Sequence, residues 1–270
     1  MVLDAVGAVS GFWDKNLTHR PTMEDAHVVV DRFGGDPGTA FFGVYDGHGG
    51  DGVANYLASH LHDNVEAEFR AKGGRAAEEC LKTAFLFTDV QCAKHLKRDS
   101  GSTAVVCVVR SAGAKQYVFT ANCGDARAVL CHDGAAVRLS KDHKATTREE
   151  VSRIRAAGGF IARERVMGVL AVARSFGDFA LKRYVTCDPY TSTTKLNEKS
   201  QFLIIACDGV WDVLSDRAAV DLVKNHVAAA GRGSARARAK HTSSELLVRR
   251  ALELGSTDNI TALVVFLHKD

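Results

Sequence analysis

Aspartates stand at the ends of apolar runs in this sequence, where a folded chain could bring them together. The run FFGVY stops at Asp46, FTANCG stops at Asp125, and FLIIAC stops at Asp208. The run NITALVVF begins directly after Asp258. Carboxylates a few ångströms apart repel one another unless some are protonated or a cation lies between them. Oxygen-only ligands suit hard cations, so a cluster of this kind would favour magnesium or manganese over zinc.

Asp-Gly pairs have a second explanation, because both residues tolerate the positive φ of tight turns. The pair at 133–134 lies between two alternating runs in AVLCHDGAAVRL, and we expect a hairpin turn there. The pairs at 46–47 and 208–209 are each followed by helix-like sequence, which a hairpin does not explain. From this patterning alone, a carboxylate cluster and independent turn or cap roles both stay open.

The elements that must position these acids follow from the hydrophobic pattern. Strand-like runs predict strands at 26–31, 40–45, 103–109, 116–121, 126–131, 135–139, 202–206 and 260–267. Apolar residues at intervals of three or four predict a helix from Gly52 to the glycine pair at 73–74, and helices at 75–97, 147–157, 214–229 and 243–254. Short turns between strands favour antiparallel pairing, because parallel crossovers need a dozen or more residues. The pattern predicts sheets covered by helices, in one domain over residues 1–270.

The overall composition is ordinary for a soluble chain with a substantial core. Of the 270 residues, 46% are hydrophobic and 25% are charged. The net charge is 35 − 32 = +3, which gives a field too weak to predict a nucleic-acid partner. No apolar run approaches the roughly 18 residues of a membrane span. We expect a monomer with no nucleic-acid and no membrane partner.

The cysteines and the N-terminal segment indicate an intracellular protein. The seven cysteines are odd in number and form no C-x-x-C pair, so neither a disulfide framework nor a zinc ribbon is indicated. Free thiols fit a reducing compartment. The segment MVLDAVGAVSGFWDKN has no basic start and is a poor signal peptide. We expect a cytoplasmic location, with the nucleus as a second one.

Seven sequence blocks resemble, in the same order, those of the metal-dependent protein phosphatases of the type 2C family. The blocks are RPTMEDAH (20–27), VYDGHGG (44–50), GSTAV (101–105), NCGDARAVL (122–130), GVLAVARSFGD (168–178), FLIIACDGVWDV (202–213) and GSTDNITALVV (255–265). The resemblance covers nearly the whole chain, and seven ordered blocks are far more specific than any one of them. It implies an α+β fold, a four-layer α/β/β/α sandwich of two antiparallel sheets flanked by helix pairs. It also implies hydrolysis of phosphoserine and phosphothreonine esters in proteins by a single catalytic domain.

The resemblance further implies a binding site for two Mg²⁺ or Mn²⁺ ions. By this likeness Asp46 would bridge the two ions, and the carbonyl of Gly47 would ligate one of them. Glu24 would serve the second ion, while Asp208 and Asp258 would hold the first.

Three more roles come from the same resemblance. Asp125, together with Asp208 and Asp212, resembles the acids of a weaker third metal site. Arg20 would bind the substrate phosphate, because the planar guanidinium offers two hydrogen bonds at once. His48 would act as the general acid that protonates the leaving oxygen.

Two acids in these blocks are expected to be structural. We expect Asp25 to order Arg20 or backbone amides rather than to bind metal. We expect Asp178 to be a structural acid at the start of a helix.

The reaction implied by the resemblance needs no covalent enzyme intermediate. Two divalent cations roughly 3.5–4 Å apart can share a water molecule and lower its pKa, which gives a hydroxide at neutral pH. That hydroxide would attack phosphorus in line. A serine alkoxide is a poor leaving group, so a general acid should contribute on the order of 10²–10⁴-fold.

The chain departs from the family pattern in a few places. Ala126 stands where serine is frequent and Ala145 where proline is usual, and neither is an expected ligand. The segment 156–170 matches the family's flap only loosely and is expected to contribute to substrate choice. The basic run GRGSARARAKH (231–241) is interpreted as a solvated loop between helices, with a docking surface or a nuclear signal as alternatives.

A rival from another class is a pseudophosphatase, a phosphoprotein-binding module that keeps the fold without turnover. The intact acids Glu24, Asp46, Asp208 and Asp258 speak against it. A protein kinase is disfavoured because SFGDF is not D-F-G and no H-R-D-x-x-x-x-N loop is present.

Overall fold

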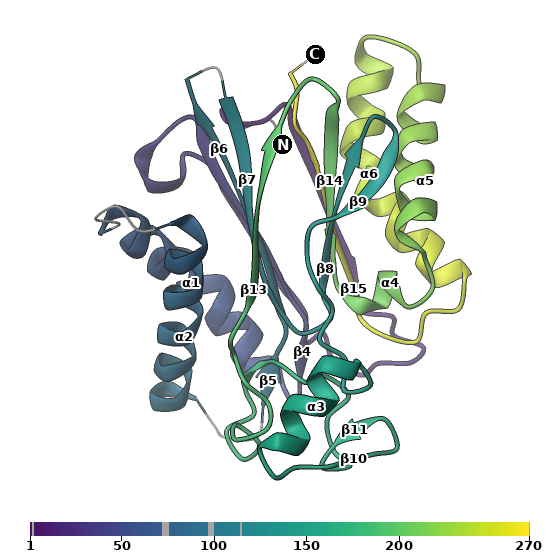
Figure 1. The fold of residues 1–270 in the computed structure, drawn as a ribbon. Helices are drawn as coiled ribbons and strands as arrows, with labels where there is room; N and C mark the ends of the chain where they lie inside the picture. Colours follow the sequence, from purple (N-terminus) through teal and green to yellow (C-terminus); the bar gives the residue numbers. More distant parts are fainter. Residues whose placement is uncertain (2, 72–75, 97–99, 114, 270) are drawn as a thin grey trace.

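Two five-stranded antiparallel sheets lie between helices on both sides (Figure 1). The computed structural model describes residues 1, 3–71, 76–96, 100–113 and 115–269. The first sheet has the order β1 (Ala8–Asp14), β15 (Ile260–Phe266), β14 (Ser200–Ala206), β8 (Arg127–His132) and β9 (Ala135–Arg138). The second has the order β13 (Tyr190–Leu196), β7 (Lys115–Cys123), β6 (Ala104–Ala112), β3 (Thr39–Tyr45) and β2 (Ala26–Val30).

Helices cover the outer face of each sheet (Figure 1). On the second sheet lie α1 (Gly52–Arg70) and α2 (Ala77–His95), and on the first lie α4 (Asp208–Trp211), α5 (Asp216–Ala229) and α6 (Ser234–Glu253). The described part of the chain contains no helix with the length and apolar character needed to cross a bilayer.

Alternation along the strands explains how one chain fills three apolar layers. In β3, Phe42 and Val44 face the first sheet, while Phe41 and Tyr45 face α1 and α2. Successive side chains of a strand point to opposite faces, so a strand covered on both faces is apolar at nearly every position. The observed fold is therefore the expected α+β sandwich, with layers in the order helices, sheet, sheet, helices.

Several short elements lie at the lower end of the sandwich in Figure 1. They are β4 (Gly47–His48), β5 (Gly101–Ser102), β12 (Phe176–Gly177), α3 (Arg148–Ala156), β10 (Ile161–Ala162) and β11 (Arg165–Val166). The first three form a small sheet in the order β12-β5-β4. A 3₁₀ turn, Phe33–Gly35, lies between β2 and β3.

Most elements form where the hydrophobic period predicts them. The helix predicted from Gly52 begins there, and α3 and α5 lie within two residues of their predicted ranges. The predicted helix boundaries at 73–74, 75 and 97 lie outside the described residues. The Asp133-Gly134 pair has φ of 52° and 74° and joins β8 to β9, which confirms the predicted hairpin turn.

Three sequence expectations are wrong or incomplete. The basic run 231–241 is mostly helical, because α6 begins at Ser234; alanine and arginine are good helix formers, and Ala239 packs into the core beneath. Asp178 has φ of 48° and is followed by turns, so it does not start a helix. The strands β1 and β13 were not predicted; β13 reads YTSTTKL, and an edge strand with few apolar residues gives little periodic signal.

Candidate active site

The strand register carries five aspartates to one end of the sandwich. In the first sheet the last residue of β14 pairs with residues near the starts of β15 and β8. Asp208, Asp258 and Asp125, which follow or precede these strands, therefore come to the same end. In the second sheet the first residue of β2 pairs with the last residue of β3. Asp25, just before β2, and Asp46, just after β3, therefore lie at the same end of that sheet.

Three of these acids meet closely. Asp46, Asp125 and Asp208 each offer a carboxylate oxygen, and the three oxygens lie within 4.8 Å of one another. They come from the end of β3, the connection between β7 and β8, and the first residue of α4. The sequence separates them by many tens of residues, so only the packing of the two sheets creates the group.

The electrostatics of this group show the cost of the arrangement. Burial, and next the charge of Asp208, raise the pKa of Asp46 well above its usual range. Burial and the charge of Asp208 raise the pKa of Asp125 to about 7. Burial and the charges of Asp258 and Asp212 raise the pKa of Asp208 to about 6. Carboxylates buried and crowded in this way bind protons more readily than exposed ones, and a nearby cation opposes this.

Asp25 belongs to this acidic group, although the sequence suggested a supporting role. Burial raises its pKa to about 7, and the charges of Asp208 and Asp258 also raise it. Its Oδ2 atom accepts a hydrogen bond of 2.7 Å from the Thr261 hydroxyl. Asp25 therefore adds one more acid whose ionisation is coupled to the others in the group.

Arg20 lies beside the acids and contacts one of them. Its Nη2 atom donates to Asp258 Oδ2 at 2.6 Å, and its Nε atom donates to the Thr257 carbonyl at 3.2 Å. The Arg20 side chain is 47% exposed. A guanidinium at the edge of an acidic group can reach a solvent-borne anion while it stays close to the carboxylates.

Glu24 is tied to the same end of the molecule by its backbone and side chain. Its amide donates to Asn259 Oδ1 at 2.8 Å, and its Oε2 atom accepts from the Gly50 amide at 3.3 Å. Asn259 also donates from Nδ2 to the carbonyls of Lys15 and Thr22, at 2.8 and 2.9 Å. Asn259, which directly follows Asp258, thus links the start of β15 to the segment that carries Arg20 and Glu24. Sequence analysis missed this role.

Gly47 is placed by close packing. A Cβ atom at this position would collide with the Glu24 carbonyl and press on the Ala54 side chain. The lack of a side chain thus lets the chain after Asp46 lie against the segment of Glu24. The next two glycines, Gly49 and Gly50, have φ of 67° and 120°, where a side chain would be strained.

Asp212 lies one turn after Asp208 and contacts a lysine. Its Oδ1 atom accepts from Lys144 Nζ at 2.7 Å, and the same ammonium lies 3.7 Å from Asp125 Oδ2. Burial lowers the pKa of Lys144, but the hydrogen bond to Asp212 and the nearby carboxylates outweigh it and raise the pKa. Sequence analysis missed Lys144, which lies outside the seven blocks.

His48 is held by an aspartate from a distant part of the chain. Its Nε2 atom lies 2.7 Å from Asp178 Oδ2, which also accepts a hydrogen bond from the Ser175 hydroxyl. A Cβ atom at Gly101 would collide with both the imidazole and the Asp178 carboxylate, so this glycine permits the pair to form. Sequence analysis placed Asp178 in a matching block but did not connect it with His48.

The residues at this end fit divalent cations. The donors are carboxylate oxygens, and burial together with mutual repulsion raises the pKa values of Asp46, Asp125 and Asp208, which a bound cation would lower. The Lys144 ammonium already stands among them as a positive charge.

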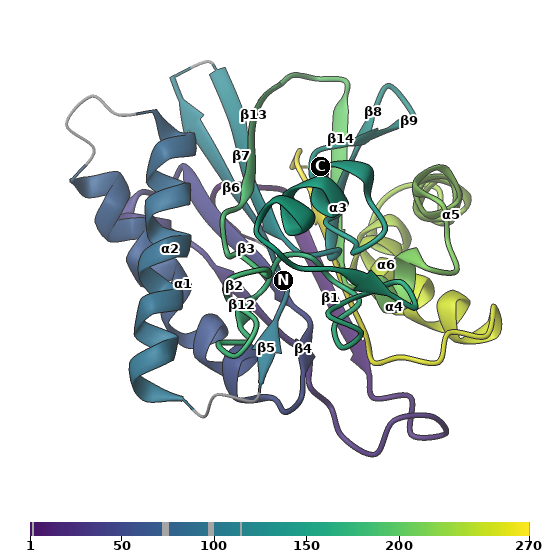
Figure 2. The ribbon, with the colours of Figure 1, turned by 60° about the horizontal axis from the view of Figure 1, so that its bottom comes forward.

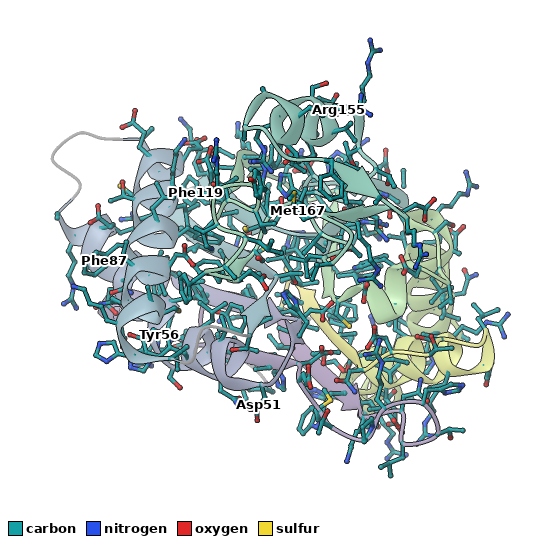
Figure 3. The ribbon with its side chains drawn as sticks, turned by 90° about the horizontal axis from the view of Figure 1, so that it is seen from below. Asp51, Tyr56, Phe87, Phe119, Arg155 and Met167 are labelled. Carbon is teal, nitrogen blue, oxygen red and sulfur yellow. The ribbon has the colours of Figure 1, made fainter. Side chains whose placement is uncertain are left out.

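A separate segment crosses the same end of the sandwich. In Figure 2, α3 and the β10–β11 hairpin come to the front, between α1–α2 on one side and α4–α6 on the other. Figure 3, seen from below, shows Arg155 and Met167 on this segment and Asp51 at the start of α1. The segment contains the expected flap at 156–170, and its own small core includes Ile154 and Val166.

Comparison with known proteins supports the family expected from the sequence blocks. The model of the family "Protein phosphatase 2C" matches residues 12–260. Protein phosphatase 2C homolog 1 of Saccharomyces cerevisiae is 37% identical over 267 residues, covering 94% of this chain and 91% of that protein. The protein of the same name from Schizosaccharomyces pombe is 40% identical over 261 residues, covering 95% of this chain and 72% of that protein.

A solved structure shares the fold. A phosphatase from a pathogenic strain of Toxoplasma gondii has a TM-score of 0.85 at 23% identity, covering 100% of this chain and 95% of that chain. The fold and the matched relatives together define the class as a protein phosphatase. The chain belongs to the protein phosphatase 2C family.

Proposed function

We propose that this protein hydrolyses phosphoserine and phosphothreonine esters in protein substrates, and that its activity depends on Mg²⁺ or Mn²⁺. The observation that carries the proposal is the meeting of Asp46, Asp125 and Asp208, whose oxygens lie within 4.8 Å of one another. Family membership supports the reaction class. We further propose that residues 1–270 act as one catalytic domain.

The proposed cation ligands form two sets, one for each of two ions. Asp46, directly after β3, would serve both ions, and the Gly47 carbonyl and Glu24 would serve one of them. Asp208 and Asp258 would hold the other ion. When bound, such cations supply water activation at neutral pH and stabilise negative charge on the phosphoryl oxygens.

Arg20 would bind the substrate phosphate, and His48 would protonate the leaving group. Arg20 lies at the solvent-exposed edge of the acids, where its guanidinium would bind two oxygens of the phosphate and orient phosphorus. His48 would donate a proton to the leaving oxygen of serine or threonine. Because Nε2 contacts Asp178, Nδ1 is the nitrogen left to carry that proton.

Asp125 and Asp212 would complete a weaker third cation site with Asp208. Asp125 is buried, and the Asp212 side chain is 56% exposed. Asp212 is exposed and its Oδ1 atom already contacts the Lys144 ammonium at 2.7 Å, which supports a weaker affinity at this site.

A direct test measures hydrolysis of a phosphothreonine peptide and of p-nitrophenyl phosphate by the purified protein. We expect both reactions with Mn²⁺ or Mg²⁺, and neither in excess chelator. Asp208→Asn removes a proposed ligand that contributes several kcal/mol, so activity should fall on the order of 100-fold or more.

Asp133→Asn is the matched control for this variant. It makes the same change at an exposed hairpin position where asparagine tolerates the observed φ of 52°. Full activity in chelator would refute the cation requirement. Cation binding without turnover on either substrate would instead support a phosphoprotein-binding module.

A further inference from the structure

Lys144 places its ammonium among the acids proposed for the third cation. Its Nζ atom lies 2.7 Å from Asp212 Oδ1 and 3.7 Å from Asp125 Oδ2. Asp125 in turn belongs to the group of three acids whose oxygens lie within 4.8 Å of one another. The ammonium therefore touches this group from the side of Asp212.

An ammonium and a divalent cation are alternatives at such a position. The lysine head is a compact charge with three donors, so it can neutralise carboxylates that a metal ion would otherwise bind. Two positive charges a few ångströms apart repel each other, and the repulsion grows where water is scarce. Asp125 has a side chain only 6% exposed, so water screens this part of the group weakly.

The backbone of Lys144 keeps the ammonium near the acids. Residues 144 and 172 form an antiparallel bridge, and the Ala145 amide donates to the Ala171 carbonyl at 2.8 Å. The Lys144 carbonyl accepts from the Thr147 amide at 3.0 Å, directly before α3. A tethered group competes at a high local concentration that dilution of the protein does not change.

We propose that Lys144 is a built-in competitor of the third cation, so that binding at Asp125 and Asp212 requires its ammonium to move away. The inference rests on the proposed function, because it takes these acids as cation ligands. Lys144 also forms part of the base of the segment that crosses the site. Displacement of its side chain would therefore occur next to the start of α3.

The test counts bound Mn²⁺ directly and does not depend on turnover. Free Mn²⁺ is measured by electron paramagnetic resonance during titration of the wild-type protein, Lys144→Gln and Lys141→Gln. Removal of a positive charge at this distance should tighten the weakest class of Mn²⁺ sites roughly tenfold or more in Lys144→Gln. Lys141 is exposed and three residues away, and its described contacts with Asn122 involve only its backbone, so Lys141→Gln should match the wild type.

A second readout separates competition from damage to the fold. In chelator, Lys144→Gln should melt at a lower temperature than the wild type, because the acids lose a counter-charge, and saturating Mn²⁺ should raise its melting temperature by more. Lys144→Met, which keeps an unbranched apolar stem, should behave in the same way and replaces Lys144→Gln if that variant does not fold.

The outcomes distinguish the two proposals. Equal Mn²⁺ affinities of the weakest sites in the wild type and both Lys144 variants would overturn the competitor role and leave the proposed function standing. No Mn²⁺ binding by any variant would overturn both.

Discussion

At the scale of single residues, the pairing of His48 with Asp178 decides which imidazole nitrogen can serve the substrate. The contact of 2.7 Å involves Nε2, and the Ser175 hydroxyl fixes the same carboxylate oxygen. An aspartate in this position orients the imidazole ring and decides which ring nitrogen is free to face the substrate. We infer that Asp178 positions His48.

Asp178→Asn should therefore slow the reactions that need a proton most. Alkyl phosphates have poor leaving groups, so kcat for a phosphoserine peptide should fall roughly tenfold or more, while kcat for p-nitrophenyl phosphate falls less. Steady-state kinetics on both substrates provide the measurement. In the double variant with His48→Gln, the second change should add little; equal losses on the two substrates would contradict the positioning role.

At the scale of elements, Glu150 anchors the segment that crosses the end of the sandwich where the acids meet. It is 2% exposed, and its carboxylate accepts from Arg174 Nη2 at 2.6 Å and from Arg153 Nε at 2.8 Å. The two arginines also donate to the carbonyls of Asp188 and Ala173. One buried acid thus joins α3 to Arg174, at the far end of the connection that follows the helix.

Glu150→Gln should loosen this segment without touching the acidic group. Loss of one partner from a buried ion pair leaves the arginines poorly compensated and should cost about 3 kcal/mol in the free energy of unfolding. Urea unfolding measures the cost, and limited proteolysis should cut within 157–172 sooner than in the wild type. Glu149→Gln makes the same change on the exposed neighbour and should leave both readouts unchanged.

At the scale of the whole molecule, an apolar core holds the two sheets together, and their packing brings several aspartates close to one another at one end. Burial, and next the repulsion among these acids, raises the pKa values of Asp25, Asp46, Asp125 and Asp208. Their protonation, or a bound cation, relieves this repulsion. Stability of the fold and occupancy of the site are therefore linked.

The sign of this linkage can be tested with Asp25→Asn in chelator. Asp25 has its pKa raised from 3.8 to about 7 in the folded protein, so its contribution to wild-type stability is lost as pH rises through that range. The amide stays neutral and can still accept from Thr261. Relative to the wild type, the variant should therefore gain on the order of 1–2 kcal/mol between pH 5 and pH 8.

Urea unfolding at several pH values measures the difference. Asp51→Asn, at an exposed position before α1, is the control and should show no such trend. If the difference in unfolding free energy between wild type and Asp25→Asn did not change with pH, the pKa of Asp25 would not be raised in the folded protein. With Mn²⁺ present the trend should weaken, because a cation stabilises the ionised acid.

The predictions succeeded where burial leaves a clear pattern, as in the three-to-four spacing of α1 and the continuous apolar run of β3. They failed where burial leaves no such pattern. The edge strand β13 carries polar residues on both faces, and its pairing with β7 supplies what its own pattern lacks. The start of α6 was hidden because its basic residues suggested a solvated loop, whereas its alanines favour a helix.

By itself, the sequence determined which acids end which strands, the period of each buried element, and the ordered blocks that identify the family. It could not show that Asp178 reaches His48, that Lys144 enters the acidic group, or that Asp25 shares its charge. These contacts join residues up to 236 positions apart, as in the bond between Asp25 and Thr261. Electrostatic coupling depends on distance and on exclusion of water, and only the packing of the two sheets sets either quantity.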